Sequence, residues 1–297
     1  MIKICWLTII LIVQGLQVSS GESLRVRASK GSRDLIIGGT DADPKKFPFF
    51  SWLNFQSDSF SIISSCGGTL INPDVVMTAA QCIYGIKNID VWVNSTSRKF
   101  SQYEYLRKAK QIVPHPKFSP SKNGNDIGLI FLDTPVKNVP LARLNRNISV
   151  PGDVRSLVTA VGFGRTSQNS FGDDFLSIND DDSNQAYPET LKMASFYTVT
   201  QRSCLKTLGS WKVHESNICA SEGSNGVCLG DVGGPLIHPR ASSQGYAQIG
   251  IISSILSSSC VSKGVPQLFT DVAKFADWID QTICKFSKSK PKSCSKA

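Results

Sequence analysis

Cysteine and histidine are the residues whose types and spacing could do chemistry most directly. Of nine cysteines among 297 residues, Cys5 lies in an apolar amino-terminal run, which leaves eight in the rest of the chain. An even number is typical of a disulfide framework in a secreted protein. The histidines His115, His214 and His238 are scattered, and neither Cys-x-x-Cys nor His-x-x-x-His occurs. We therefore expect disulfides, no metal site and no cofactor.

The amino-terminal segment indicates the compartment. Lys3 precedes the uncharged, mostly apolar run 4–13, and small residues follow at Ser19 and Ser20, which is typical of a secretory signal peptide. The run is shorter than the roughly 20 apolar residues that span a bilayer. We expect a signal peptide at 1–20, a propeptide or linker at 21–35, and a secreted, extracellular protein without a membrane span.

Charge is distributed unevenly along the chain. Lys plus Arg number 32 against 23 Asp plus Glu, a formal net charge of +9, which favours acidic partners. A basic C-terminal tail at 285–297 contains five lysines and no acid. A second basic patch consists of Arg98, Lys99, Arg107, Lys108 and Lys110. Two interpretations stay open, a site for a polyanion or anionic surface and simple solvated faces; we expect no nucleic acid partner.

Other polar signals concern modification and cation binding. Sequons begin at Asn94 and Asn147, and we expect one of them to be glycosylated. Five aspartates crowd the segment 173–182, which could hold Ca²⁺, although it lacks the regular alternation of an EF-hand loop. Cation binding by this segment is left open.

The elements that must position these groups are mostly strands. Short apolar or alternating runs separated by turns occur at 49–55, 68–71, 75–80, 89–93, 127–132, 157–163 and 249–255. Many short strands and few helical patterns indicate an all-β sandwich or barrel. One stretch differs, because Val272, Phe275, Ala276, Ile279 and Ile283 recur at helical spacing, and it predicts a C-terminal α-helix.

Four motifs occur in order along the chain. They are Ile36-Ile37-Gly38-Gly39, Cys66-Gly67-Gly68-Thr69-Leu70 with Thr78-Ala79-Ala80-Gln81-Cys82, Asn125-Asp126-Ile127-Gly128-Leu129, and Gly230-Asp231-Val232-Gly233-Gly234-Pro235-Leu236. Together they resemble the chymotrypsin/trypsin family of serine proteases over about 36–284. The resemblance implies two packed six-stranded antiparallel β-barrels with a cleft between them, followed by the C-terminal helix.

The resemblance also implies disulfide pairs, which spacing alone does not specify. Three pairs match the family, and the two remaining cysteines are then expected to close the basic tail. The expected pairs are Cys66–Cys82, Cys204–Cys219, Cys228–Cys260 and Cys284–Cys294.

The catalytic positions depart from the family. There, a Ser attacks the scissile carbonyl, a His takes its proton and an Asp orients the His. The corresponding positions hold Val232, Gln81 and Asp126. Valine has no nucleophilic atom, and glutamine does not titrate near neutral pH. We expect negligible peptidase activity, because losing one such group removes about 10⁶ in rate, and a structural Asp126 that accepts a hydrogen bond from the Gln81 amide.

The resemblance places the specificity pocket at Gly226, Ser253, Ile255 and Gln267. Gly226 stands where a carboxylate would select Lys or Arg. Ile255 and Gln267 replace two wall glycines, and we expect their side chains to fill the pocket. An alternative stays open, because the alignment could slip by one residue within the serine-rich run 253–259.

Activation and the oxyanion site are likewise implied only by the family. Zymogens are cut before the Ile36 position, and the new amino group pairs with the Asp231 position. Leu35 precedes Ile36, so cleavage after the nearby Arg33 would leave two extra residues. The N–H groups of Gly230 and Val232 are expected to form an oxyanion-type nest.

Three functions remain in competition. The first is a catalytically deficient serine protease homologue that binds an unknown extracellular protein, such as a hydrolase, as a decoy, inhibitor or cofactor. The second is binding of a polyanion or anionic surface by the basic segments. The third is residual serine-type endopeptidase activity through unforeseen groups, which we consider the weakest.

Overall fold

The computed structural model describes residues 39–55, 65–98, 105–121, 124–152, 155–165, 187–221, 226–242, 245–254, 260 and 264–296. The chain divides into two compact units, Met1–Arg33 and Asp34–Ala297, and every described residue belongs to the second. The expected signal peptide, the propeptide, Ile36, Lys99, the segment 173–182 and Ile255 lie outside the described residues.

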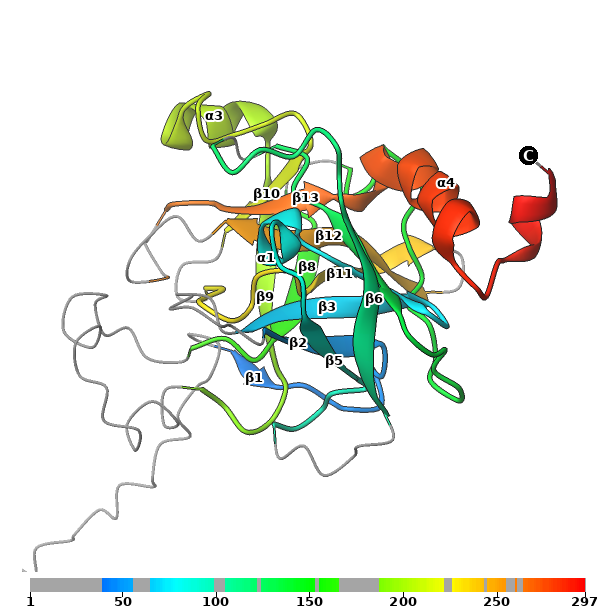
Figure 1. The fold of residues 1–297 in the computed structure, drawn as a ribbon. Helices are drawn as coiled ribbons and strands as arrows, with labels where there is room; N and C mark the ends of the chain where they lie inside the picture. The colour runs from blue at the N-terminus through cyan, green and yellow to red at the C-terminus, as the bar shows by residue number, and fades with distance from the viewer. Residues whose placement is uncertain are drawn as a thin grey trace, which may run out of the picture. The chain divides into compact units, whose positions relative to one another are not determined.

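Six antiparallel strands close the first barrel (Figure 1). They are β2 (Phe50–Phe55), β3 (Ser65–Asn72), β4 (Val75–Thr78), β5 (Ile89–Val93), β6 (Leu106–Pro114) and β7 (Gly128–Leu132), joined in the order β2-β3-β4-β7-β6-β5. In β5, Ile89, Val91 and Val93 are buried while the residues between them are half-buried, which is the alternation that the pleat of a strand produces. The central β7 is buried throughout.

The second barrel also has six antiparallel strands. They are β8 (Leu157–Gly162), β9 (Lys192–Val199), β10 (Asn217–Ser221), β11 (Pro235–Ser242), β12 (Gly245–Ser254) and β13 (Gln267–Asp271). The order β9-β10-β13-β12-β11-β8 is closed by pairing of β8 with β9, and the short β1 (Thr40–Asp41) pairs with β9 as an additional edge. The expected pair of six-stranded antiparallel barrels is confirmed.

Helices are few and short in the described part of the chain. They are α1 (Ala80–Ile83), α3 (Gln201–Leu208), the 3₁₀ turn η2 (Val272–Phe275), α4 (Ala276–Phe286) and the 3₁₀ turn η3 (Lys292–Lys296). Ile279 and Ile283 of α4 are buried, and Phe286 packs edge-on against Phe131 of β7 with ring centroids 5.6 Å apart. The expected C-terminal helix is confirmed. None of the described helices has the length and apolarity to cross a membrane.

Four disulfides join Cys66–Cys82, Cys204–Cys219, Cys228–Cys260 and Cys284–Cys294. These are the same four pairs that the resemblance implies. The last disulfide, Cys284–Cys294, closes the C-terminal segment that begins at the end of α4. Four of the five lysines of the basic tail lie between these two cysteines, and Lys296 lies two residues beyond the second.

A buried carboxylate fixes that segment to the first barrel. Asp74, between β3 and β4, accepts hydrogen bonds from Asn72 Nδ2, from Ser287 Oγ and from the backbone N–H of Lys288, each at 2.7 Å. Hydrogen bonds to a charged acceptor are shorter and stronger than neutral ones. Asp74 therefore ties the residues that follow α4 to the turn between two strands.

Replacing Asp74 by asparagine should lower the free energy of unfolding by about 2 kcal/mol, because an amide oxygen can accept only part of this set and leaves buried donors unpaired. Chemical denaturation at pH 7 measures the change. The matched control is Asp43→Asn, since Asp43 is exposed and its carboxylate accepts a hydrogen bond from the N–H of Lys45; its effect should stay within about 0.5 kcal/mol. Equal effects of the two variants would contradict the anchoring role.

Candidate functional site

Gln81 and Asp126 meet at the centre of the candidate site. Gln81 lies on α1, directly after β4, and Asp126 lies two residues before β7. The backbone N–H of Gln81 donates to Asp126 Oδ1 at 2.8 Å, and its Nε2 donates to Oδ2 at 2.6 Å. The expected amide-to-carboxylate hydrogen bond is thus present. Ser253 Oγ of β12 also donates to this carboxylate, at Oδ2, over a distance of 2.7 Å.

Asp126 is shielded from solvent but surrounded by hydrogen-bond donors. Its side chain is 2% exposed. Burial raises the pKa of Asp126, and the hydrogen bonds from Ser253 and Gln81 lower it by less, so the net shift is upward. The backbone oxygen of Asp126 also accepts from Thr270 Oγ1 at 2.8 Å. Asp126 is therefore held from both sides by neutral donors.

Val232 lies shortly before β11, and its carbonyl oxygen is 3.7 Å from the sulfur of Cys82, the residue after Gln81. The N–H of Gly233 donates to the carbonyl of Ile252 at 2.8 Å, and Gln81 Nε2 donates to the next carbonyl, that of Ser253, at 2.5 Å. The carbonyl of Val232 accepts from the N–H of Gly67 at 2.7 Å. The half-buried valine side chain packs on the apolar core, so this position presents methyl groups and no titratable atom.

The turn that carries Val232 depends on close backbone packing. Gly233 has a φ of 86°, and a Cβ at this residue would lie 2.4 Å from the carbonyl oxygen of Gly67. Only glycine satisfies both conditions. The N–H groups of Gly230 and Val232 form no hydrogen bond with the residues that the structure describes, and the oxyanion-type nest remains a prediction.

Asp231 is the most deeply buried acid of the site, with an exposed fraction of 0%. Its two carboxylate oxygens accept from the N–H groups of Gly164 at 2.7 Å and Cys228 at 2.9 Å. A Cβ on Gly164 would lie 2.2 Å from Asp231 Oδ2, so that position must be glycine. Burial raises the pKa of Asp231 to about 7, against the lowering effect of the two N–H donors.

Gln267 bridges the segments that border the expected specificity pocket. Its buried side chain accepts at Oε1 from the N–H of Val227 at 2.9 Å and donates from Nε2 to the carbonyl of Cys260 at 2.9 Å. Val227 directly follows Gly226, which is buried as well. The Gln267 amide thus connects the same two chain segments that the Cys228–Cys260 disulfide joins.

Similarity to known proteins identifies the family of this chain. The family model described as trypsin matches residues 36–279. The chain belongs to the trypsin family. The activity of the trypsin family is that of a serine-type endopeptidase. Family membership together with four disulfides is consistent with an extracellular or secretory-pathway protein.

Three relatives share fewer than a third of the aligned residues with this chain. Phenoloxidase-activating factor 1 of Holotrichia diomphalia is 26% identical over 279 residues, covering 84% of this chain and 70% of that protein. Granzyme B of Rattus norvegicus is 27% identical over 265 residues, covering 87% and 95%. CLIP domain-containing serine protease B10 of Anopheles gambiae is 29% identical over 282 residues, covering 84% and 70%.

Two of the histidines have well-defined surroundings in the trypsin-family fold. His115 packs edge-on against Phe275 and Trp278, with ring centroids 5.1 and 4.9 Å away, and burial lowers its pKa. His214 Nδ1 lies 2.8 Å from Ser216 Oγ. Both rings are thus engaged in local packing or hydrogen bonding. No group of three or more His, Cys, Asp or Glu suited to a metal ion occurs among the described residues.

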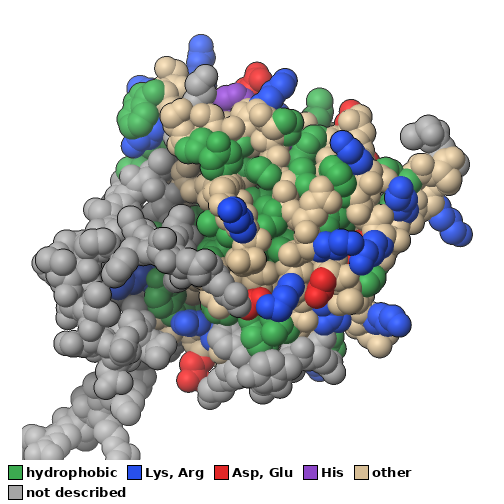
Figure 2. All heavy atoms as spheres, in the orientation of Figure 1, with side chains coloured by type: hydrophobic (Ala, Val, Ile, Leu, Met, Phe, Trp, Pro, Cys, Tyr) green, Lys and Arg blue, Asp and Glu red, His purple; other side chains and the backbone are tan. Residues whose placement is uncertain are grey.

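The expected surface sites are placed as follows in this trypsin-family member. Asn94 follows β5 and is half-buried with a φ of 55°, whereas Asn147 is exposed. Within the basic patch, Arg98 lies over the ring of Tyr187 at 5.1 Å, and Lys108 pairs with Asp90 at 3.4 Å. Lys110 is exposed. Figure 2 shows lysine and arginine side chains gathered over β6 and toward the C-terminal segment.

Sequence reasoning missed two members of the site. Ser253 was assigned to the pocket, yet its hydroxyl donates to Asp126, and Thr270 was not singled out although it binds the Asp126 carbonyl. These residues lie 127 and 144 positions from Asp126 in the sequence. No local pattern connects them with Asp126, because Ser253 and Thr270 lie on the paired strands β12 and β13 of the second barrel, whereas Asp126 precedes β7 of the first.

Proposed function

We propose that this chain is a trypsin-family protein without peptidase activity, which acts by binding another extracellular protein as a decoy, inhibitor or cofactor. The observation that carries the proposal is the Gln81 amide bound to the Asp126 carboxylate. The amide supplies the hydrogen bond that an imidazole would make, but it cannot take up a proton from a nucleophile. Val232, at the position of the family's nucleophile, has no nucleophilic atom.

The Gln267 bridge supports the same proposal from the substrate side. Its amide is bonded across to Val227 and Cys260, so its atoms occupy space that a glycine at this position would leave free for a substrate side chain. A substrate residue could enter only by breaking these buried hydrogen bonds, which is unfavourable. We infer that the scaffold is retained for its surface loops. The name of the relative phenoloxidase-activating factor 1 is in keeping with an enzyme as the partner.

A second candidate function, polyanion binding, is favoured by the C-terminal segment. Lys285, Lys288, Lys290 and Lys292 are exposed, and they lie between or beside the cysteines of the Cys284–Cys294 disulfide. The Asp74 anchor holds the same segment against the first barrel. Lysines held on a short, closed segment lose little conformational freedom on binding, which favours recognition of a linear array of negative charges.

One experiment tests both functions. The mature chain is immobilised and exposed to extracellular fluid of its source, and bound proteins and polysaccharides are eluted with a salt gradient and identified. A quadruple variant, Lys285→Gln, Lys288→Gln, Lys290→Gln and Lys292→Gln, is treated identically. A single protein retained at high salt by both chains supports the binding function. Mixed acidic material that leaves at low salt, and only from the unaltered chain, supports the second function instead. If neither chain retains a protein, the first proposal is wrong.

The polyanion function makes a quantitative prediction for heparin as the probe. The quadruple glutamine variant should bind heparin about tenfold more weakly at physiological salt, and its affinity should depend less steeply on salt, because fewer counterions are released. The matched control replaces by glutamine four exposed lysines outside this segment, and so lowers the net charge by the same amount. They are Lys45, Lys46, Lys87 and Lys117. Equal weakening of both variants in calorimetry would attribute binding to net charge rather than to the segment.

A further inference from the structure

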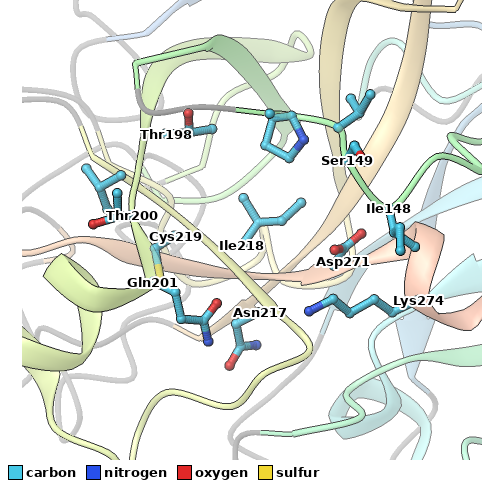
Figure 3. A pocket seen from close by; sticks show the side chains of 14 residues that line it. Ile148, Ser149, Thr198, Thr200, Gln201, Asn217, Ile218, Cys219, Asp271 and Lys274 are labelled. Atoms are coloured by element: carbon cyan, nitrogen blue, oxygen red, sulfur yellow. The ribbon is translucent and has the colours of Figure 1, made fainter.

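A pocket of about 490 Å³ opens on the second barrel. The segment 148–152, the end of β9, the start of α3, the start of β10 and the residues around the start of η2 line it (Figure 3). None of the residues assigned above to the triad positions, the specificity pocket or the Asp231 site lines this pocket. Its volume lies within the range of small-molecule sites in proteins.

Asp271, the last residue of β13, is a buried acid that lines this pocket. Its Oδ1 accepts from the N–H of Ala273 at 3.1 Å, whereas Oδ2 has no donor among the described residues and is not fully enclosed. The three other buried acids of the described chain, Asp74, Asp126 and Asp231, each accept at least two hydrogen bonds. Asp271 therefore has an acceptor oxygen to spare, and it faces the pocket.

Lys274 does not neutralise this carboxylate by direct pairing. It lies three residues further along the chain, is exposed, and directs its Nζ to the carbonyl of Glu215. No ion pair joins Lys274 to Asp271 in the part of the chain that the structure describes. Burial raises the pKa of Asp271 to about 6, against the lowering effects of the Lys274 charge and of the Ala273 N–H. Above that pH the pocket contains a buried anion without a cation in contact, and buried acids are rarely left unpaired.

Apolar side chains surround the carboxylate. Ile218 lies on β10 and Val199 on the end of β9, and Val150 belongs to the segment 148–152 on the pocket's edge. In Figure 3 the Asp271 carboxylate and the Ile218 side chain face the middle of the pocket, whereas the Lys274 side chain extends toward Asn217. A cation carried on an apolar stem would match both the acid and these walls.

The number of available oxygens selects the kind of cation. A guanidinium group prefers to bind both oxygens of a carboxylate at once, whereas an ammonium group acts as a point charge. Because Oδ1 of Asp271 is already bound to the Ala273 N–H, an ammonium group suits the remaining oxygen better. A divalent metal ion needs several oxygen ligands, and a single carboxylate does not supply them.

We propose that this pocket binds a primary ammonium group carried on an apolar stem, of the kind that a lysine side chain presents. The ammonium donates to Asp271 Oδ2 in a charge-assisted hydrogen bond. The methylene groups of the stem pack on Ile218 and Val199. This site goes beyond the proposed function, and the two can fail separately, because the pocket shares no residue with the positions of Gln81, Val232 and Gln267.

Titration calorimetry at pH 8 with three probes tests the proposal. N-acetyl-L-lysine amide represents a peptide side chain, n-butylamine represents a free amine, and N-acetyl-L-norleucine amide has the apolar stem without the ammonium group. Binding of either ammonium probe, without binding of the norleucine probe, supports the proposal, and the better of the two identifies the source of the ammonium group. The proposal is wrong if neither ammonium probe binds at millimolar concentration or if the norleucine probe binds equally well.

A first variant attributes binding to the Asp271 carboxylate. Asp271→Asn keeps an oxygen that can accept from the Ala273 N–H but removes the charge, and it should weaken binding of the better ammonium probe by about tenfold. Asp277→Asn is the matched control, because Asp277 is exposed on α4, does not line the pocket and carries the same charge; it should change affinity less than about twofold. Equal affinities of the Asp271→Asn and unaltered chains would overturn the assignment.

A second variant should have the opposite effect. Lys274→Gln removes a positive charge near the bound ammonium group and should strengthen binding by at least about twofold. Lys206→Gln is the matched control, because Lys206 is exposed on α3 and does not line the pocket. If Lys274→Gln left the affinity unchanged or lowered it, the ammonium group would not lie at Asp271, and this result would overturn the proposal even if Asp271→Asn failed to fold.

Discussion

Replacing Gln81 by alanine should lower the free energy of unfolding by about 3 kcal/mol at pH 8. The substitution removes the Nε2 donor that reaches both Asp126 Oδ2 at 2.6 Å and the Ser253 carbonyl at 2.5 Å. Removing one partner from a buried charged group is costly because the other partner stays buried and under-satisfied. Denaturant unfolding of the two chains measures the difference directly.

The penalty of Gln81→Ala should shrink as the pH falls. The pKa of Asp126 is raised in the folded protein, so the folded state takes up a proton there more readily than the unfolded state, and acid removes the unpaired charge. Gln201→Ala is the matched control, because Gln201 is exposed and its side-chain amide donates to the His214 carbonyl at 3.0 Å. A Gln81→Ala protein as stable as the unaltered chain would show that the hydrogen bond is dispensable.

Asp231 should make the uncleaved chain less stable as the pH rises. Its pKa is raised from 3.8 to about 7, so between these values the folded state binds a proton that the unfolded state lacks, and stability is lost as that proton leaves. The contribution amounts to about 2.5 kcal/mol between pH 5 and pH 8. Asp231→Asn should remove this part of the pH dependence.

The comparison must be made between variants, because other groups titrate in the same range. The pKa of Asp271 is raised to about 6 and acts in the same direction, while the lowered pKa of His115 acts in the opposite one. Asp43→Asn, at an exposed position, is the matched control for the loss of one carboxylate. If Asp231→Asn has the profile of the unaltered chain, the buried carboxyl does not titrate as described.

A related prediction concerns the stability of the chain after cleavage before Ile36. If the new amino group pairs with Asp231, a nearby cation will lower the pKa of this carboxyl and remove its destabilising effect at neutral pH. Chain cut after Leu35 should then be more stable than uncut chain at pH 8, and the difference should vanish in Asp231→Asn. Identical unfolding curves for cut and uncut chain would separate Asp231 from activation.

Strands that alternate or that are apolar throughout could be predicted from the sequence, whereas a strand rich in charged residues could not. The run 89–93 coincides with β5, and the run 127–132 differs from β7 by one residue. In contrast, β6 was treated as part of a basic patch because it contains Arg107, Lys108 and Lys110, although its residues Ala109, Ile112 and Val113 pack on the core. The closure of each sheet into a barrel depends on pairings between distant strands, and only the resemblance indicated it.

The short helix α3 was missed for a similar reason. It spans Gln201–Leu208, with Cys204 as its one buried residue, so it has no periodic apolar face to detect. A capping signal was available, since Thr200 Oγ1 accepts from the N–H of Ser203 at 3.0 Å, and threonine is a favoured cap.

The candidate site was predictable in its identities but not in its contacts. The motif order located Gln81, Asp126 and Val232, and the chemistry of the residue types predicted the amide-to-carboxylate hydrogen bond. The partners of Gln267 were not predictable, because its side chain was expected only to fill a space and instead joins Val227 to Cys260. Such a bridge depends on the relative position of two loops, which a linear pattern does not contain.

Purified mature chain, uncut and cut after Leu35, is incubated with a diverse peptide library to measure peptidase activity. A serine-reactive fluorophosphonate is added to a parallel sample. We expect no cleavage products above those of the buffer and no labelled serine, because loss of the base or the nucleophile alone removes about 10⁶ in rate. Peptide products that appear with the unaltered chain and disappear with Asp126→Ala would contradict it.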